Sequence, residues 1–260
     1  MENEFILKPA DNAASRGVIL VNKNDNPDYK ELYDYCEQYS RSGATLVEEF
    51  MTGPEVSVES YSVNGVPYII TITDKIVTEI PYFVELGHTE PSRLSQEAQE
   101  DIKRVATAAI KAIGMLNGPT HTEIKVTSTG AKLVEIAARL GGDFITSRLV
   151  PLSTGVDMIE CSFASLLKEE VPVEKKFQKG SAIRFIQGEK GTLKQINGIE
   201  KAKGIDGVVD VEIYKNIGDI ICRPQNSNDR VGHIITVGEN ANEAAQTAEQ
   251  ALGVIEVIVD

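Results

Sequence analysis

Two glutamates on neighbouring short strands are the residues of this sequence best placed to do chemistry. Glu123 lies in HTEIKV and Glu135 in KLVEIA, with a Ser-Thr-Gly turn between the two segments. If the strands form a hairpin with a five-residue connection, strand alternation places Glu123 directly opposite Glu135. Like charges so placed destabilise a sheet unless a cation neutralises them, and Mg²⁺ is usually held by one or two carboxylates plus substrate phosphates. The pair predicts a magnesium site, with a solvated acidic face as the alternative.

The segment after Glu135 adds a cation and a flexible backbone. Arg139 lies two residues beyond Ala137, so alternation returns its side chain to the carboxylate face. Gly141 and Gly142 permit a tight turn and the close approach of a ligand. A cation beside two metal-binding carboxylates suits a phosphoryl group undergoing transfer, which makes Arg139 a candidate catalytic residue. A salt bridge from Arg139 to one of the glutamates is the other interpretation.

A lysine on the first predicted strand lies beside a loop of small residues. Lys8 belongs to EFILKP, and the loop after it contains Ser15, Arg16 and Gly17 before a second strand begins. Two strands around such a loop predict a hairpin, and the loop amides could close over nucleotide phosphates. The chain contains no G-x-x-x-x-G-K-[ST] motif, so this loop is not a P-loop.

The stretch LVEEFMTGPE leads from one predicted sheet to the next. An apolar strand ends in Glu48 and Glu49, and Met51 and a Thr-Gly-Pro breaker precede Glu55. A hinge of this kind can supply backbone hydrogen bonds to an adenine edge, while Glu55 accepts hydrogen bonds from ribose hydroxyls. The structural alternative makes Glu48 and Glu49 the polar end of a strand.

Hydrophobic periodicity and turn signals predict the elements that hold these residues. Asn26 and Pro27 predict the start of a helix, and Gly43 its end. The alternating strands VSVESYSV and VPYIITIT flank an Asn-Gly dipeptide, a strong hairpin signal. One apolar face runs along a helix of about residues 95–113. The rest of the chain predicts a helix at residues 157–167 and a linker at 168–179. Three strands at 181–187, 208–214 and 233–237 and a final helix at 241–252 follow.

The composition excludes several classes of protein. The formal net charge is −13, whereas nucleic-acid binding needs concentrated Lys and Arg. No apolar run approaches the length of a membrane helix, and MENEFILKPA lacks the regions of a secretory signal. Cys36, Cys161 and Cys222 are few and widely spaced, which argues against a disulfide framework or a cysteine-ligated zinc site. We therefore expect a cytoplasmic protein without nucleic-acid or membrane partners.

Taken in order, these motifs resemble the ATP-grasp superfamily, and within it the L-amino-acid ligases and carbamoyl-phosphate-synthase-like proteins. The segments that carry the resemblance are FILKPA…SRGV, LVEEFMTGPEVSVE, ELGHTEPS, GPTHTEIKV and KLVEIAARLGGD. They cover about residues 5 to 160, and the tail, including NDRVGHIITVGENANEA, is similar to the carboxy-terminal domain of those ligases. Each motif alone is weak, but five in this order are specific.

The resemblance implies an α+β chain with the ATP-grasp fold. A small lid subdomain and a larger antiparallel-sheet subdomain would be followed by a small α+β carboxy-terminal domain. The corresponding boundaries are 1–54 for a partial lid, 55–170 for the catalytic subdomain and 178–260 for the carboxy-terminal domain.

The resemblance also implies roles for individual residues. The nucleotide contacts would be Lys8 on the α-phosphate or adenine, Ser15, Arg16 and Gly17 in the phosphate-covering loop, Glu48, Glu49 and Met51 around adenine, and Glu55 on the ribose. Glu123 and Glu135 would hold Mg²⁺, with Mn²⁺ as an alternative metal, and Arg139 would stabilise the transferred phosphoryl group. The substrate pocket would contain Glu85, His88, Arg139, Gly141 and Gly142.

The implied reaction joins a carboxylate, here that of an amino acid, to an amine. The carboxylate attacks the γ-phosphate of ATP to give an acyl phosphate and ADP, and the amine then expels phosphate. Two other functions stay open: an enzyme that phosphorylates bicarbonate or formate, and a nucleotide-binding module without turnover.

Two features depart from the family pattern. The α/β domain that usually precedes the Lys8 hairpin is absent, which predicts a truncated chain or one half of a split enzyme. Many relatives carry an Asn metal ligand where this sequence has Ala137, which weakens the case for a second Mg²⁺. The expected partners are small carboxylate and amine substrates, together with a second copy of the chain or a separate amino-terminal domain or subunit.

Overall fold

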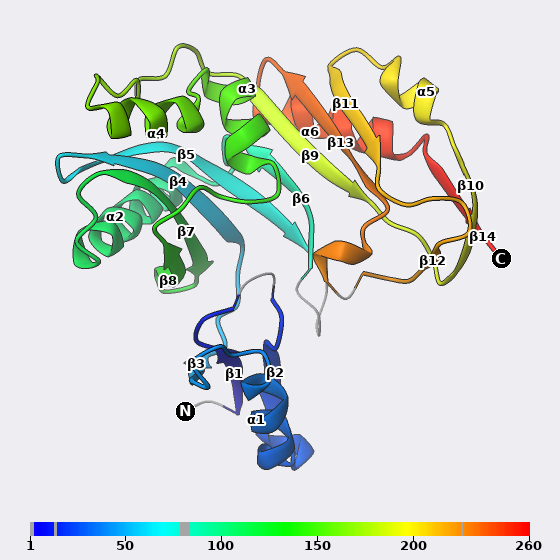
Figure 1. Cartoon of the computed structure of the whole chain (residues 1–260), viewed down its shortest axis with the longest axis horizontal. Coiled ribbons are helices and arrows are strands. Elements are labelled where there is room, and N and C mark those ends of the chain that lie inside the picture. The colour runs from blue at the N-terminus through cyan, green and yellow to red at the C-terminus, as the bar shows by residue number, and fades with distance from the viewer. Residues whose placement is uncertain (1–2, 13–14, 79–83, 225) are drawn as a thin grey trace.

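The fold contains a small three-stranded sheet at the amino-terminal end. The structure, a computed structural model, describes residues 3–12, 15–78, 84–224 and 226–260. Three antiparallel strands in the order β2-β1-β3 pack on one helix through Phe5, Leu7 and Cys36. These elements are β1 (Glu4–Pro9), β2 (Ile19–Asn22), the short 3₁₀ helix η1 (Lys23–Asp25), α1 (Tyr29–Glu37) and β3 (Thr45–Glu49). They form the small body below the rest of the molecule in Figure 1.

An eight-stranded antiparallel sheet forms the centre of the molecule. Its order is β11-β13-β9-β6-β5-β4-β7-β8, and every neighbouring pair is antiparallel. The strands are β4 (Glu55–Val63), β5 (Val66–Val77), β6 (Glu85–Glu90), β7 (Gly118–Thr127), β8 (Gly130–Ala137), β9 (Gly180–Ile186), β11 (Val208–Ile213) and β13 (Gly232–Gly238). The Asn-Gly hairpin predicted between β4 and β5 is confirmed, with Asn64 at a positive φ of 51°.

Helices cover both faces of this sheet (Figure 1). Ile102 and Ala106 of α2 pack against Val56 and Ile124 on one face. Leu149 and Met158 pack with Tyr61 on the other. Because both faces are covered, the interior of β4 is buried without alternation. The helices are α2 (Gln96–Ala112), the π-helix η2 (Ile145–Leu149), α3 (Val150–Thr154), α4 (Met158–Leu167) and α6 (Ala241–Leu252).

The carboxy-terminal third contributes to two sheets. Strands β9, β11 and β13 extend the large sheet, so this sheet continues across the irregular stretch 168–179. A small sheet in the order β12-β10-β14 lies at the far end, around its own apolar cluster. Its elements and their neighbours are β10 (Gly191–Asn197), α5 (Ile199–Lys203), β12 (Ile220–Ile221), η3 (Ser227–Asp229) and β14 (Glu256–Val259). The domain boundaries at 54, 170 and 178 stay a prediction.

The architecture agrees with the predicted α+β fold, a small lid sheet facing a larger antiparallel sheet, although one helix start was wrong. Ser95 and Asp157 cap the helices predicted to follow them, and the predicted helix of residues 241–252 has the observed bounds. The first helix begins after Asp28, whose side chain caps it, whereas Asn26 ends η1 with a left-handed backbone. Among the described residues, no helix is long and apolar enough to cross a membrane.

Candidate functional site

A cavity of about 410 Å³ lies between the small amino-terminal sheet (β2-β1-β3) and the large eight-stranded sheet. Side chains from β1 and β3 line one side, and side chains from β4, β5, β7 and β8 line the other. Ten of the residues predicted from the sequence line it: Lys8, Ser15, Arg16, Glu48, Glu49, Met51, Glu55, Glu85, Glu123 and Glu135. Residues 13 and 14, which directly precede the predicted phosphate-covering loop of Ser15, Arg16 and Gly17, lie outside the described residues.

Five predicted site residues lie away from the cavity lining. Gly17 has a φ of +78°, and a side chain there would collide with Pro9 and Tyr39, so this glycine serves the turn. The others are His88, Arg139, Gly141 and Gly142, which lie in β6 or in the loop after β8.

The β7–β8 hairpin brings Glu123 and Glu135 face to face, as predicted, but by a different route. The connection is two residues long, since Thr127 pairs with Gly130. The predicted five-residue connection is therefore wrong. A shift of register at Val134 restores the pairing, because without this extra residue Glu123 would lie opposite Val134.

Lys8 joins the small sheet to this irregular point of β8. Its ammonium donates to the carbonyl oxygen of Val134 at 3.3 Å and lies 2.7 Å from a carboxylate oxygen of Glu48. A second link between the sheets is the ion pair of Lys132 with Glu49, at 2.8 Å. The two sheets are thus held together at the rim of the cavity by lysine side chains.

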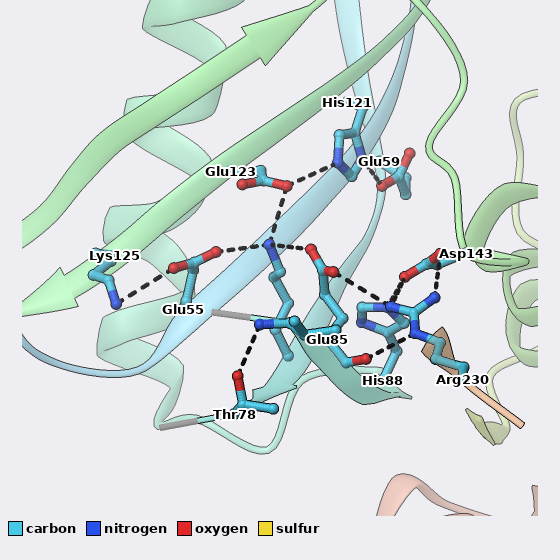
Figure 2. A network of polar contacts seen from close by, with 12 residues as sticks. Glu55, Glu59, Thr78, Glu85, His88, His121, Glu123, Lys125, Asp143 and Arg230 are labelled. Atoms are coloured by element: carbon cyan, nitrogen blue, oxygen red, sulfur yellow. Dashed lines mark hydrogen bonds and ion pairs between the residues drawn. The ribbon is translucent and has the colours of Figure 1, made fainter. Parts of the chain in front are cut away.

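Lys75, on β5, lies at the centre of the acidic wall of the cavity. Its Nζ is 2.6 Å from Glu55, 3.0 Å from Glu123 and 3.7 Å from Glu85. Only 4% of its side chain is exposed. Burial alone would lower the pKa of Lys75, but the three carboxylates raise it above its usual range. Glu55 is also 3.3 Å from Lys125, so two lysines flank the residue predicted to contact ribose (Figure 2).

Behind Glu123 a histidine and a buried glutamate form a short chain of contacts (Figure 2). Nε2 of His121 lies 3.4 Å from Glu123, and Nδ1 lies 2.5 Å from Glu59, which is fully buried. Glu59 and Glu123 raise the pKa of His121 to about 10 against the opposing effect of burial. Burial would raise the pKa of Glu123, but Lys75 and His121 hold it below its usual range.

The donor set at Glu123 and Glu135 fits Mg²⁺ shared with phosphate oxygens. Two carboxylates face each other at the cavity, and burial together with the charge of Glu123 raises the pKa of Glu135. A divalent cation would relieve this repulsion, and one or two carboxylates plus phosphates suffice for Mg²⁺. Within the described residues no group of three or more His, Cys, Asp or Glu side chains could hold a metal alone.

A second cluster of charges lies next to Glu85 and is mostly buried (Figure 2). Arg230, just before β13, donates to both carboxylate oxygens of Asp143 at 2.9 and 2.8 Å. It also donates to the side chain of Glu85 at 3.3 Å and to its main-chain carbonyl at 3.1 Å. His88 is 1% exposed, and its Nε2 lies 3.4 Å from Asp143. The predicted substrate residues Glu85 and His88 therefore lie side by side, joined through residues from distant parts of the chain.

Arg139 has an exposed side chain that donates to the carbonyl of Leu140 at 2.9 Å. The described contacts include no ion pair between Arg139 and Glu123 or Glu135. Its predicted place beside the carboxylates stays a prediction. Gly141, two residues on, packs so tightly that a Cβ would lie 2.8 Å from both carboxylate oxygens of Glu59.

Sequence reasoning missed Lys75 and the Asp143–Arg230 pair. Lys75 lies two residues after the segment VPYIITIT, on the same strand β5. A cation on a buried strand is a signal that could have been used. Arg230 gives no comparable signal, because its partners are 87 and 145 residues away along the chain.

Comparison with known families and proteins gives matches over most of the chain. The model described as ATP-grasp domain matches residues 1–147, and the one described as L-amino acid ligase C-terminal domain 2 matches residues 184–260. The uncharacterized protein y4rH of Sinorhizobium fredii (strain NBRC 101917 / NGR234) is 31% identical over 95% of this chain and 51% of its own length. Alanine–anticapsin ligase of Bacillus subtilis (strain 168) is 31% identical over 53% of this chain and 33% of its own length.

The fold has a match among solved structures. The crystal structure of L-amino acid ligase from Bacillus licheniformis superposes with a TM-score of 0.84 at 24% identity, covering 100% of this chain and 64% of that one. The chain spans about half the length of the first curated relative named above. Because the ATP-grasp model covers more than half of the chain and the fold agrees, the protein belongs to the ATP-grasp family.

Proposed function

We propose that this chain forms the nucleotide-binding and carboxylate-activating part of an ADP-forming ligase that joins an amino acid carboxylate to an amine. The observation that carries the proposal is the pairing of Glu123 with Glu135 at the edge of a cavity between two sheets. The size of this cavity and its mixed apolar and charged lining suit a nucleotide.

The nucleotide would enter between the small sheet and the large sheet. Apolar side chains of the cavity, such as Ile6 and Leu133, would contact the adenine ring, with Glu48, Glu49 and Met51 at the same side. Lys8 at one rim and Lys75 at the other would face the phosphates, together with Ser15 and Arg16. Lys75 is an addition to the nucleotide contacts implied by the sequence, and Gly17 lies outside the cavity lining.

Glu123 and Glu135 would hold Mg²⁺, which would neutralise phosphate charge and orient the γ-phosphate for in-line attack. His121 fixes the orientation of Glu123 from behind, because its other nitrogen is held by Glu59. Mn²⁺ offers the same oxygen preference and is proposed as an alternative metal.

The activated group would be the carboxylate of the amino acid substrate, which attacks the γ-phosphorus and displaces ADP. An amine then attacks the acyl carbon of the resulting acyl phosphate and expels phosphate. We assign Glu85, His88, Gly141 and Gly142 to the substrate side, where Glu85 alone both lines the cavity and contacts the buried cluster. Arg139, on the loop that contains the two glycines, would stabilise the phosphoryl group.

ADP release measured with ATP, Mg²⁺ and a mixture of the twenty amino acids tests the proposal. We expect release above the level without amino acids, and loss of this stimulation in Glu135→Ala. Glu200→Ala serves as the matched control, because it removes an exposed glutamate whose ion pair among the described residues is with Lys203. Parallel reactions with bicarbonate or formate alone separate the second function: stimulation by either, without amino acids, contradicts the ligase. Binding of nucleotide without any stimulated release would leave a module without turnover.

A further inference from the structure

Arg230 is a buried cation that connects three segments far apart in the sequence. It comes from the turn before β13, whereas Glu85 begins β6 and Asp143 follows β8. Its side chain is 4% exposed, and the centre of its guanidinium lies 3.6 Å from the ring centroid of Phe185. Stacking on one face and hydrogen bonds along the edge leave the guanidinium a single position.

The contact with Asp143 is the fork-to-fork geometry that fixes both partners. Two parallel N–H···O bonds of 2.9 and 2.8 Å join the guanidinium to the two carboxylate oxygens. Burial would raise the pKa of Asp143, but His88 and Arg230 hold it well below its usual range. Asp143 therefore faces the guanidinium as a carboxylate, and the two bonds fix its position.

Asp143 sits in a backbone conformation that needs such support. Its φ is +49° and that of Phe144 is +62°, two consecutive left-handed residues that are not glycine. Such residues cost about 1–3 kcal/mol each and persist only where surrounding contacts hold them. Phe144 is the N-cap of the π-helix η2, and the two residues directly follow the loop of residues 138–142, which contains Arg139.

The same guanidinium fixes the position of Glu85. Bonds to the side chain and to the main-chain carbonyl anchor the first residue of β6, and this residue lines the cavity. Arg230 thus sets the distance between the cavity wall at Glu85 and the loop after β8, although it does not itself line the cavity.

The geometry points to Arg230 as a positioning residue for the amino acid substrate. Provided by the carboxy-terminal third of the chain, it holds the loop of residues 138–144 against β6 and so fixes the substrate side of the site. This inference rests on the proposed function, since it assigns the substrate to the space between Glu85 and that loop. Of the described contacts of Arg230, only those with Glu85 reach a residue that lines the cavity, so we expect a small effect on nucleotide binding.

The test compares Arg230→Lys and Arg230→Met with the parent chain and with Arg223→Met. Arg223 is the matched control, because it makes a similar two-bond contact with Glu189 in the same segment but is 80% exposed. ADP release is measured while the amino acid mixture is titrated at saturating ATP, and binding of a non-hydrolysable ATP analogue is measured by calorimetry.

We expect both Arg230 variants to raise the half-saturating amino acid concentration by about 10- to 100-fold, because small misplacements of a site carry penalties of this size. Affinity for the ATP analogue should stay within about twofold, and Arg223→Met should match the parent. Arg230→Lys keeps the charge and decides the matter if Arg230→Met does not fold. An unchanged amino acid dependence in Arg230→Lys, or a parallel loss of analogue affinity, overturns the inference.

Hydrogen exchange of the amides of residues 139–146 provides a readout that does not need turnover. We expect Arg230→Lys to speed their exchange at least about tenfold while the amides of β4 stay protected. A parent chain that releases no ADP with any amino acid contradicts the proposed function and the substrate part of this inference. Unchanged exchange at residues 139–146 overturns the structural part.

Discussion

Two cations organise the polar network of this protein, and they do so differently. Lys75 shares one ammonium among Glu55, Glu85 and Glu123, at the wall of a cavity. Arg230 holds Asp143 through two parallel bonds, away from the cavity. An ammonium is a point charge that its partners can leave one at a time, whereas a stacked guanidinium in a fork contact is fixed.

The difference separates two tasks within one site. The end around Lys75 carries an excess of carboxylates, including the opposed pair of Glu123 and Glu135, and suits an incoming metal with phosphates. The end around Arg230 has matched charges and a strained backbone, and it suits the task of holding the loop after β8 in one conformation. Glu85 contacts both cations and joins the two ends.

Loss of Lys75 should have the largest effect on stability. Lys75→Met leaves three carboxylates without their shared cation, and breaking a buried charge pair costs about 3–5 kcal/mol. Urea denaturation measures the free energy of unfolding. Lys194→Met, which breaks an exposed pair with Asp260, should cost less than about 1 kcal/mol. A cost below about 1 kcal/mol for Lys75→Met would show that the acidic wall does not depend on this cation.

Gly141 packs against Glu59 and His121, so a side chain at this position should not be tolerated. In Gly141→Ala the new Cβ would lie 2.8 Å from Glu59 and from Nδ1 of His121, so we expect a loss of about 1–3 kcal/mol from overpacking. Gly142→Ala is the matched control, since nothing lies within 4 Å of its Cβ. It should be neutral or stabilising by about 0.4–1 kcal/mol. Equal stabilities of the two variants, from thermal and urea unfolding, would contradict the packing of this loop on Glu59.

The buried carboxyl group of Glu90 should make the stability of the protein depend on pH. It accepts hydrogen bonds from Thr73 at 2.8 Å and from Ser153 at 2.9 Å, and burial raises its pKa to about 8. The folded state therefore retains a proton that the unfolded state releases near its ordinary pKa. Stability is greatest below that value and falls as the pH rises toward about 8, by about 1.4 kcal/mol per unit for this one group.

Glu90→Gln should remove this contribution from the slope of unfolding free energy between about pH 5 and pH 8. Asp143→Asn is the informative control, because Arg230 and His88 lower the pKa of Asp143. Its contribution is present above its ordinary pKa and lost only as the pH falls below it. Asp143→Asn should leave the slope between about pH 5 and pH 8 as in the parent. A parental slope in Glu90→Gln would mean that Glu90 is ionised in the folded chain.

The smallest effect should come from Glu135, with the opposite sign. Glu135→Gln removes the like charge facing Glu123, and such cross-strand pairs are worth about 0.2–1 kcal/mol. We expect the ligand-free chain to become slightly more stable in a thermal melt, although it loses a proposed metal ligand. A clear destabilisation would show that Glu135 has a structural role in the hairpin.

Local signals predicted most of the elements but not their assembly. Ser95, Asp157 and Gly253 mark helix ends, because capping depends on residues adjacent in sequence. The helix start predicted at Asn26 lies two residues too early, because Asn26 ends η1 and the side chain of Asp28 caps the helix. The strand order of the large sheet depends on pairings across the chain, which alternation does not encode.

The candidate site was predictable where its residues are close in sequence. Glu123 and Glu135 belong to one hairpin, and their pairing was predicted. It depends on a bulge at Val134 that was not foreseen, because the observed two-residue connection alone would place Glu123 opposite Val134. Lys75 and Arg230 acquire their importance from partners that are distant in the sequence. Arg139 illustrates the limit of alternation: beyond Ala137 the strand ends, so the rule that placed its side chain no longer applies.

The central claim is that Glu123 and Glu135 build a metal-dependent nucleotide site within this chain. Calorimetric titration with a non-hydrolysable ATP analogue, with and without Mg²⁺, tests it most directly, with Glu135→Ala and Glu200→Ala as the two variants. We predict binding that requires Mg²⁺, is lost in Glu135→Ala and is unchanged in Glu200→Ala. Equal binding with and without Mg²⁺, or parental affinity in Glu135→Ala, would contradict the claim.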